Sequence, residues 1–406
     1  MKRLGLRLFV VALCSSWASV SWAGLGDTLP RGTFLLDSSY IFAHTNKQFD
    51  RNGKSVPLLA PVERYEAGAG LQGVIRANPS VDQKIVALQL LYGITDDLTL
   101  AIGGPLSLST EIETNLSWQP GDYQASLGRP YSETDFWQWA ASMGQPKPAQ
   151  RGVSNVNTWG DLVVAFRLRL PRSQWMKDHH VNLALTLQGA LPTGREKDPE
   201  ELIEIGMTAW WLHNYGDLEL HLAADWRPIW SGDVARLTLS AEIYYAYLRP
   251  RTYDTPRGTK HPLLLTFAPY VGQTFEIDGG DWQVARMQVE WAPFIGPTLG
   301  TWMTRGSVEA ANAFPPMLSL MLQYTYVNLL PSIWKSNYPI WSIEQGEFWG
   351  AGFKHIFAAQ ATLSLLRVGA PLMFYVRGRA LDIIPGRNMR PANAITVGVR
   401  LLAKFW

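Results

Sequence analysis

The residues of this sequence best suited to binding or ion selection are charged side chains spaced two residues apart within apolar stretches. Arg167 and Arg169, for example, alternate with Phe166 and Leu168. In an extended strand successive side chains point to opposite faces, so the arginines share one face and the apolar residues share the other. A wall between lipid and water needs this arrangement, although half-buried strands of soluble proteins show it too.

The polar faces carry charges of both signs, and two interpretations follow if they line one lumen. The charges would either pair across the lumen and stabilise its wall, or form an arginine stripe that favours anions or carboxylates. The stripe would consist of Arg167, Arg169, Arg377, Arg379 and Arg400. The full set of candidate lumen residues is Arg167, Arg169, Glu204, Glu219, His221, Asp225, Arg227, Arg236, Glu242, Arg286, Glu290, Lys354, Arg377, Arg379 and Arg400.

A second candidate site lies in the long segment 104–158, which shows no sustained strand pattern. Ser132 and Asp135 have the spacing of a capping box, which predicts a short helix over 132–144. The candidate substrate-binding residues of this segment are Trp118, Tyr131, Phe136, Trp137, Trp139 and Met143. They would form an aromatic platform for apolar or aromatic solutes. Alternatively, the helix packs on the rim of the wall or in the lipopolysaccharide interface.

The sequence contains no common enzyme motif. Neither H-E-x-x-H nor G-x-S-x-G occurs. His355 and Ser364 share a predicted strand but fall on opposite faces, so they form no dyad. Cys14 is the single cysteine, which excludes a disulfide framework and a thiolate metal site. We therefore expect no catalytic residue, no bound metal and no cofactor.

Alternation of the same kind recurs along the whole chain and predicts an all-β protein. About fourteen strands are expected, at 31–43, 81–92, 98–103, 162–169, 181–188, 202–213, 218–227, 237–247, 263–275, 285–291, 318–327, 349–365, 372–380 and 394–405. The predicted fold is a transmembrane antiparallel up-and-down β-barrel of about 14 strands (range 12–16) with long extracellular loops. The 18 tryptophans and 15 tyrosines suit the aromatic girdles of such a barrel.

The connections between strands predict an orientation. Bacterial barrels have tight periplasmic turns and longer outer loops. If the turns at Gly93 and Asn214 are both periplasmic, the loop 104–158 lies outside the cell. The last strand ends at Phe405 and Trp406, which resembles the terminal signal that outer-membrane barrels offer to their assembly machinery.

The first 23 residues predict export. Lys2, Arg3 and Arg7 precede a short apolar run, and Ser21 and Ala23 suit a signal-peptide cleavage after residue 23. Residues 24–406 would then form a single barrel domain in the bacterial outer membrane. The net charge of +2 gives no electrostatic case for binding nucleic acid.

Three short segments resemble the outer-membrane family named for the meta-pathway of phenol degradation, which is related to long-chain fatty-acid transporters. They are the turn at 91–98, the strand opening at 160–162 and the strand exit at 191–194. The resemblance implies a barrel that passes hydrophobic or aromatic compounds. Fatty-acid transporters place a plug before the first strand, and the region between Gly24 and Pro30 is too short for one. Any gate is therefore expected in the loops.

Taken together, the sequence predicts a non-enzymatic outer-membrane channel or transporter for small hydrophobic or aromatic molecules. The first alternative is a non-conducting barrel that holds a partner protein at the membrane, and the second is a barrel enzyme that acts on lipids. The expected partners are outer-membrane lipid and lipopolysaccharide, the barrel-assembly machinery and small apolar or aromatic solutes.

Overall fold

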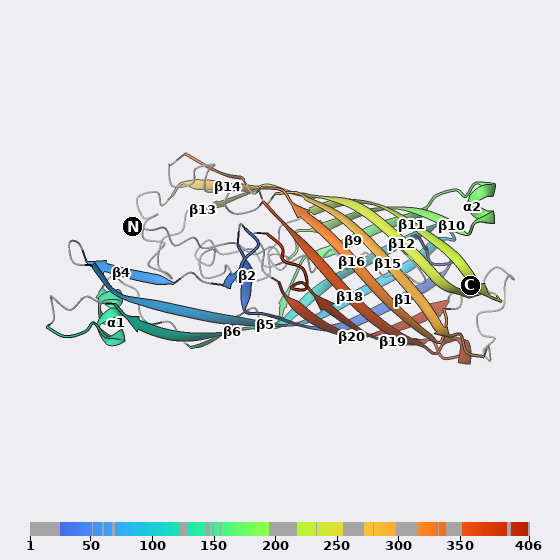
Figure 1. Ribbon diagram of the computed structural model, residues 1–406. Helices are drawn as coiled ribbons and strands as arrows, with labels where there is room; N and C mark the ends of the chain where they lie inside the picture. The colour runs from blue at the N-terminus through green and yellow to red at the C-terminus, as the bar shows by residue number, and fades with distance from the viewer. Residues whose placement is uncertain are drawn as a thin grey trace.

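A single strand with one apolar and one polar face cannot cover either face by itself. In this protein the strands close into a ring that separates the two kinds of face. The structure is a computed structural model that describes residues 25–50, 52–58, 61–66, 70–121, 128–142, 147, 150–154, 156–194, 217–232, 234–254, 272–278, 280–297, 315–331, 333–337, 351–387 and 391–404. Within these residues, twelve antiparallel strands form a closed barrel in chain order. The tilted strands wind around a common axis (Figure 1).

The strands of the ring follow one another around it in the order in which they occur in the sequence. They are β1 (Thr33–Thr45), β5 (Gly70–Thr95), β6 (Leu98–Pro120), β9 (Leu162–Arg169), β10 (Val181–Leu191), β11 (Asp217–Ser231), β12 (Val234–Leu248), β15 (Trp282–Phe294), β16 (Leu318–Leu329), β18 (Gly352–Ser364), β19 (Leu372–Ala380) and β20 (Asn393–Lys404). The all-β up-and-down architecture predicted from the sequence is confirmed.

The alternation along each strand sets which side chains face outward. On β16, Leu322 is 66% exposed on the outer face, whereas its neighbour Gln323 is 7% exposed on the inner face. The exposed apolar side chains recur at alternate positions around the ring, as at Leu220, Met287 and Val376. Such a continuous apolar outer surface is costly in water and suits the hydrocarbon core of a membrane. No helix among the described residues is long and apolar enough to cross a membrane.

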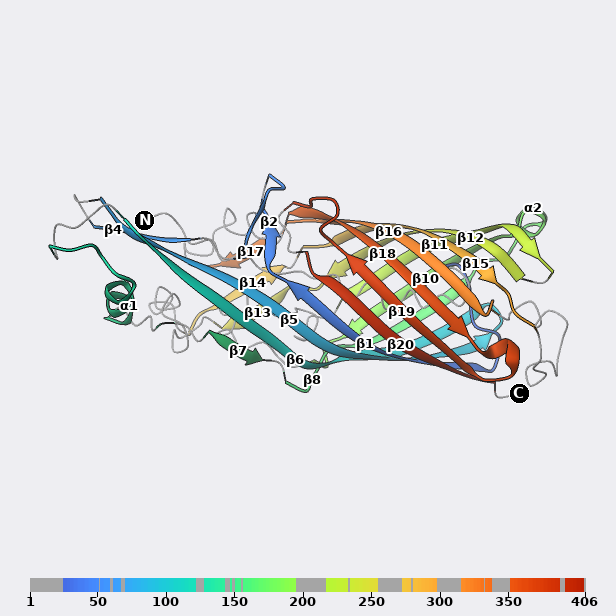
Figure 2. The same ribbon diagram turned by 60° about the horizontal axis from the view of Figure 1, so that its bottom comes forward.

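The barrel has two distinct ends. The turn end carries the start of β1, the end of β20 and the connections 96–97, 170–180, 232–233, 295–317 and 365–371. These include α2 (Gln174–Asp178) and the 3-10 helix η5 (Leu366–Val368). The loop end carries the remaining connections, and strands there continue well beyond the ring (Figure 2). Residues 25–32 precede β1 and enter the barrel from the turn end.

The predicted number of fourteen strands is too high by two. β10 pairs directly with β11, and β12 pairs directly with β15, so the predicted strands 202–213 and 263–275 have no place in the ring. Residues 202–213 lie outside the described residues, and the described part of the other segment belongs to β14 (Thr274–Asp278) in a separate sheet. Alternation is a local property, whereas membership of the ring depends on pairing with two distant strands.

The predicted turn at Asn214 lies outside the described residues, and the strand after it begins at the loop end. Asp217 begins β11 and pairs with Ala190 and Leu248, at the loop end. The turn after Gly93 lies at the opposite end, beside the first residues of β1. The start of β11 and the Gly93 turn therefore lie at opposite ends of the barrel. Both termini of the ring lie with the Gly93 turn at the turn end.

The prediction that 104–158 lacks strand structure is wrong for its first part. β5 and β6 stay paired from Thr95 and Leu98 as far as Gly73 and Pro120. β6 leaves its ring partner β9 at Gly103, so the rest of the hairpin projects beyond the barrel (Figure 2). There both faces meet water, so hydrophobic alternation disappears while backbone pairing continues.

Short strands brace this projection. β4 (Val62–Glu66) pairs with β5, while β7 (Arg151–Ser154) and β8 (Thr158–Trp159) pair with β6. β2 (Lys47–Phe49) and β3 (Ser55–Pro57) form a separate hairpin. β13 (Arg251–Asp254), β14 and β17 (Ile333–Ser336) form a second small sheet at the loop end.

The ring is closed by the contact of β1 with β20, which holds a buried polar cluster. Arg400 on β20 donates from Nε to Asp37 Oδ2 at 2.8 Å, and Tyr375 on β19 donates to Asp37 Oδ1 at 2.9 Å. The ring of Tyr375 crosses over Gly398 to reach β1. A Cβ atom at position 398 would lie 2.2 Å from Tyr375 Cζ, so only glycine leaves room for this contact. The cluster joins three strands at the point of closure.

Candidate functional site: the barrel lumen

The inner wall of the barrel brings most of the predicted lumen residues together. Glu219, His221, Asp225 and Glu242 are each no more than 2% exposed. Arg167, Arg286, Lys354 and Arg400 are also buried, and Arg377 and Arg379 are partly exposed on the inner face of β19. Glu204 lies outside the described residues. The alternation thus located the charged inner wall correctly. It did not identify which charged side chains pair with one another or which residues lie inside the lumen.

Glu242 is the centre of a buried charge network on three neighbouring strands. Its two carboxylate oxygens contact Arg286 Nη1 at 2.6 Å and His221 Nδ1 at 3.2 Å. His221 Nε2 lies 2.8 Å from Glu219 Oε2, which also accepts from Gln188 Nε2 at 2.9 Å. The ring of His221 stacks on Tyr244 with centroids 4.3 Å apart. Charge pairing within the wall, one of the two interpretations left open by the sequence, is therefore present here.

The predicted arginine stripe does not form one continuous feature. Arg169 lies at the turn end and pairs with Asp97, with Nη2 2.6 Å from Oδ1. Arg236 is exposed near the turn end of β12. Arg167 donates to Thr186 Oγ1 at 2.9 Å on β10, across the ring from β19. Arg377 and Arg379, with Arg400 on the adjacent strand, make a separate arginine group.

The segment 25–32, which we call the N-terminal segment, crosses the turn end of the lumen. Gly26 N donates to Asp225 Oδ2 at 2.8 Å on β11, and Leu29 N donates to Thr99 Oγ1 at 2.7 Å on β6. Gly32 N then donates to Gly93 O at 2.8 Å on β5. The segment therefore spans the ring from β11 to β5. The sequence predicts this region to be too short for a plug and any gate to lie in the loops, whereas the structure places the segment inside the turn end of the lumen.

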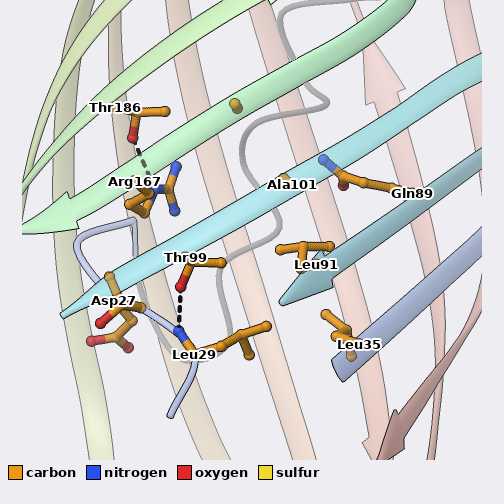
Figure 3. A pocket seen from close by; sticks show the side chains of 11 residues that line it. Asp27, Leu29, Leu35, Gln89, Leu91, Thr99, Ala101, Arg167 and Thr186 are labelled. Carbon is orange, nitrogen blue, oxygen red and sulfur yellow. Dashed lines mark hydrogen bonds between the residues drawn. The ribbon is translucent and has the colours of Figure 1, made fainter. Parts of the chain in front are cut away.

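Charged contacts fix the N-terminal segment to the wall. Asp27 Oδ2 lies 2.5 Å from Arg227 Nη2, and Asp27 Oδ1 accepts from Asn182 Nδ2 at 3.2 Å. A Cβ atom at position 26 would lie 3.1 Å from Asp225 Oδ2, so the glycine permits the close approach. Figure 3 shows Asp27 and Leu29 against the inner wall.

A small cavity remains between the N-terminal segment and the wall. It has a volume of about 30 Å³ and is lined by Leu29, Thr99, Arg167 and Thr186, among others (Figure 3). A cavity needs about 10–15 Å³ of such volume for each water molecule. This cavity has room for two or three waters and is too small for an organic solute.

Towards the loop end the inner faces of β12, β15 and β16 change from polar to apolar. Tyr244 and Val284 are neighbours in register, as are Val284 and Val327 on the next strand. One inward position nearer the turn end, the corresponding residues are Glu242, Arg286 and Thr325. The apolar part, which we call the apolar zone, is one buried cluster of Phe49, Tyr244, Ala246, Leu248, Trp282, Val284, Val327, Leu329, Ile356 and Leu381. On these strands the apolar zone thus follows a charged middle, and the buried charges of Lys354 and Glu219 border it, in register with Val327 and Ala246.

The apolar zone and the N-terminal segment were missed by the sequence analysis. A signal for the first exists, because 243–248 reads Ile-Tyr-Tyr-Ala-Tyr-Leu and is apolar on both faces of its strand. A lipid-facing strand with a watery lumen would keep polar residues at every second position. Asp27 had no such signal, since a single aspartate between glycine and threonine is ordinary for a loop.

The predicted helix over 132–144 is confirmed as α1 (Glu133–Ser142), at the far end of the projecting hairpin. Its capping box forms, with Asp135 N donating to Ser132 Oγ and Ser132 N donating to Asp135 Oδ2 at 2.8 Å. The buried Phe136 packs against Ile75, Trp118, Tyr131 and Trp137. Trp139 is 37% exposed, with the Arg64 guanidinium 4.0 Å from its ring centroid. Met143 lies outside the described residues.

These aromatic residues form the core of a small projecting unit far from the ring. Trp118 Nε1 donates to Tyr131 O at 3.2 Å, and Phe136 meets Trp137 edge to face at 5.0 Å. Most of the ring surfaces therefore face one another. Trp139 is the exposed ring among them, and the helix packs on the projecting part of β5 and β6, away from the rim of the barrel.

We expect the cap of α1 to be sensitive to Ser132→Ala. Loss of an N-cap costs about 1 kcal/mol, which corresponds to about fivefold faster amide exchange of the helix in native-state hydrogen exchange. Ser173→Ala is the matched control, because Ser173 Oγ accepts from Met176 N at 3.3 Å in α2 at the other end of the barrel. It should accelerate exchange in α2 alone, and equal acceleration of both helices would contradict the assignment.

The same cap has a defined pH dependence. The Arg129 guanidinium, followed by Ser132, holds the pKa of Asp135 well below its usual value of 3.8. A carboxylate with a depressed folded pKa stabilises the helix at pH above its unfolded pKa, and the contribution is lost as pH falls through the folded pKa. The cap should therefore persist at pH 5 and weaken only in strong acid.

No group of three or more histidine, cysteine, aspartate or glutamate side chains among the described residues is placed to hold a metal ion. The side chains of His355 and Ser364 lie as predicted on different faces, since Ser364 is buried on the inner wall while His355 contacts the outward Tyr324.

Neither a protein-family model nor any curated protein matches this sequence. Among solved structures, the COG4313 outer membrane channel from Pseudomonas putida F1 aligns over 94% of this chain and 98% of its own, with 11% identity and a TM-score of 0.52. The chain shares the fold of an outer-membrane channel. At this identity the likeness concerns the fold alone, and the resemblance to the phenol meta-pathway family stays a prediction.

Two further barrels align less well. The NanC porin has a TM-score of 0.37 with 8% identity, over 90% of this chain and 98% of its own. The CymD monoaromatic hydrocarbon channel has a TM-score of 0.33 with 8% identity, over 97% of this chain and 94% of its own.

Proposed function

We propose that this protein is a non-enzymatic channel of the bacterial outer membrane that passes small apolar or aromatic molecules. The apolar zone of the lumen carries the proposal. A channel for sugars or ions needs polar groups along its whole path to replace the water of hydration. An apolar solute instead gains free energy by leaving water for an apolar wall, so the apolar zone would collect it.

The charged middle of the lumen and the N-terminal segment then act after entry. The paired charges around Glu242 keep the wall rigid, and the segment restricts the exit at the turn end. A solute that enters through the apolar zone therefore meets first the charged middle of the lumen and then the N-terminal segment. Export through a cleaved signal peptide, contact with lipopolysaccharide and insertion by the assembly machinery remain part of this proposal.

We expect purified protein in liposomes to take up small aromatic solutes faster than sugars of similar size. Val327→Asn puts an amide into the apolar zone and should slow aromatic uptake several-fold, because the solute then loses apolar contacts. Thr325→Asn is the matched control, since position 325 is already polar and lies two residues along the same strand. Equal effects on sugars and aromatic solutes, or no uptake by the unmodified protein, would contradict the channel.

A docking barrel is the second candidate, and the projecting hairpin favours it. β5 and β6 extend far beyond the ring and carry a capped helix with an aromatic core, which channel activity does not require. Deleting 132–144 separates the two functions. A docking barrel would show no conductance in bilayers and would lose partner binding after the deletion. A channel would keep its solute uptake, or change it if the hairpin gates entry.

A further inference from the structure

Phe49 is an aromatic side chain of a polar loop segment, and it is buried in the apolar zone of the lumen. The residues around it are polar, since 44–55 reads His-Thr-Asn-Lys-Gln-Phe-Asp-Arg-Asn-Gly-Lys-Ser. The Phe49 side chain is nevertheless only 4% exposed, in the same buried cluster as Tyr244, Val327 and Ile356 of the inner wall. Its partner across the hairpin is Ser55. The phenyl ring therefore finds its apolar neighbours on the barrel and not on its own hairpin.

The β2–β3 hairpin that carries Phe49 lies at the loop end and is not part of the ring of strands (Figure 1, Figure 2). Asp50 Oδ1 accepts from Asn52 N at 2.8 Å and from Lys54 N at 2.9 Å, so the turn is closed by its own residues. Lys47 Nζ lies 2.9 Å from Asp382 Oδ2, and both side chains are partly exposed. Two-stranded hairpins are marginally stable alone, and exposed ion pairs contribute little. Burial of the Phe49 side chain therefore helps to hold the hairpin against the barrel.

We infer that Phe49 occupies a binding site for one apolar aromatic ring, and that the solutes of this channel include monocyclic arenes that exchange with this side chain. The inference rests on the proposed function and names its substrate class. The side chain of phenylalanine is a benzyl group, so the space that holds it has the size of a toluene molecule. A cavity of about 150 Å³ lined by apolar side chains stays dry and binds benzene. Departure of Phe49 would leave a space of this kind in the apolar zone.

The apolar zone is closed while Phe49 is seated. Val327 and Ala246 are each 0% exposed, so a solute reaches them only if a member of the cluster moves. The other members lie on the strands of the ring, apart from Leu381, which directly follows β19. Phe49 can leave while the barrel keeps its strand pairing. Exchange of Phe49 for a solute therefore opens the apolar zone without unfolding the wall.

Two features of the site favour an aromatic solute over an aliphatic one. Tyr244 and Trp282 belong to the cluster and can pack against a further ring edge to face or offset. Lys354, which borders the zone, places Nζ 5.6 Å from the ring centroid of Trp282. A cation at this distance attracts the face of an aromatic ring. The wall is thus already arranged for contacts with aromatic rings.

Phe49→Ala empties the site and should make the protein bind toluene about tenfold to a hundredfold more tightly than the unmodified chain. In the unmodified protein toluene competes with the seated side chain, so its apparent affinity falls with the fraction of molecules whose site is open. Burial of a phenylalanine side chain favours the seated state by about this factor. The measurement is calorimetric titration of toluene into the purified full chain in lipid nanodiscs, with empty nanodiscs as the blank.

Two variants serve as controls. Phe34→Ala removes the same side chain from the outward face of β1, where its ring lies 4.4 Å from that of Tyr92 and lipid can take its place. Phe49→Trp keeps an aromatic ring in the apolar zone. Both variants should bind toluene no more tightly than the unmodified chain.

The outcomes are distinguishable. Equal toluene affinity of Phe49→Ala and the unmodified chain overturns the arene site. A gain in Phe34→Ala or Phe49→Trp as large as in Phe49→Ala also overturns it, because the effect would then be one of loosened packing. Absence of solute uptake by the unmodified protein in liposomes contradicts the channel instead, since toluene binding is an equilibrium that does not require passage.

Discussion

Asp27→Ala is expected to release the N-terminal segment from the lumen and to raise the time that the barrel spends in a high-conductance state. The substitution removes the 2.5 Å contact with Arg227 and the hydrogen bond from Asn182. Hydrogen bonds to charged groups contribute about 1.5–3 kcal/mol, so the ratio of released to seated segment should rise about tenfold to a hundredfold.

Single-channel recordings in planar bilayers measure this ratio directly. Arg31→Ala is the control within the same segment, because the side chain of Arg31 is exposed and its backbone N–H makes the contact with Asp96 Oδ1. Conductance traces of Asp27→Ala that match those of the unmodified protein would show that the segment does not obstruct the path. Deleting residues 25–30 should give the same high-conductance state as Asp27→Ala, and the barrel should spend more time in it.

Glu242→Leu is expected to destabilise the barrel by about 3–5 kcal/mol, the usual cost of leaving a buried partner charge unpaired. Arg286 is 2% exposed and its guanidinium contacts Glu242 at 2.6 Å. His221 would lose its second carboxylate at the same time. The free energy of unfolding in urea, with the protein in lipid vesicles, gives the size of the effect.

The double variant Glu242→Leu, Arg286→Met separates the ion pair from packing. Replacing both members of a buried pair by apolar residues of similar volume is often neutral or stabilising, so most of the loss should be recovered. If the single variant changes the free energy of unfolding by less than about 0.5 kcal/mol, as typical surface substitutions do, the pair is not structurally important. If the double variant is as unstable as the single one, packing rather than charge explains the loss.

Much of the wall was predictable from the sequence, because alternation directly reports a strand with two different surroundings. The segments at 162–169 and 181–188 became β9 and β10, and their arginine and glutamine side chains face the lumen as expected. The same logic failed at 104–120, where water on both sides of the projecting hairpin removes the pattern. It also counted two strands too many, because alternation cannot show that β10 already pairs with β11.

The candidate site was only partly predictable for a different reason. Residue types on the inner face follow from spacing, so Glu242 and Arg377 were named, but which charges pair depends on the shape of the closed ring. Asp27 and Arg227 are 200 residues apart and meet only because the chain before β1 turns inward. No local pattern encodes such a contact. The helix α1 was predictable, because its cap is encoded within four residues.

The closure of the ring at Asp37 and Arg400 also determines when the barrel can be completed. Every other contact in the ring joins two strands that follow one another in chain order. β1 and β20 are instead the first and last strands of the ring, and Asp37 and Arg400 are 363 residues apart in sequence. Because closing so long a loop costs the most entropy, we expect this pairing to form last. A slip of β20 by one residue would turn Arg400 towards lipid and leave Asp37 unpaired. The buried cluster thus favours the correct register, because a misaligned ring lacks the contacts that hold β1 to β20.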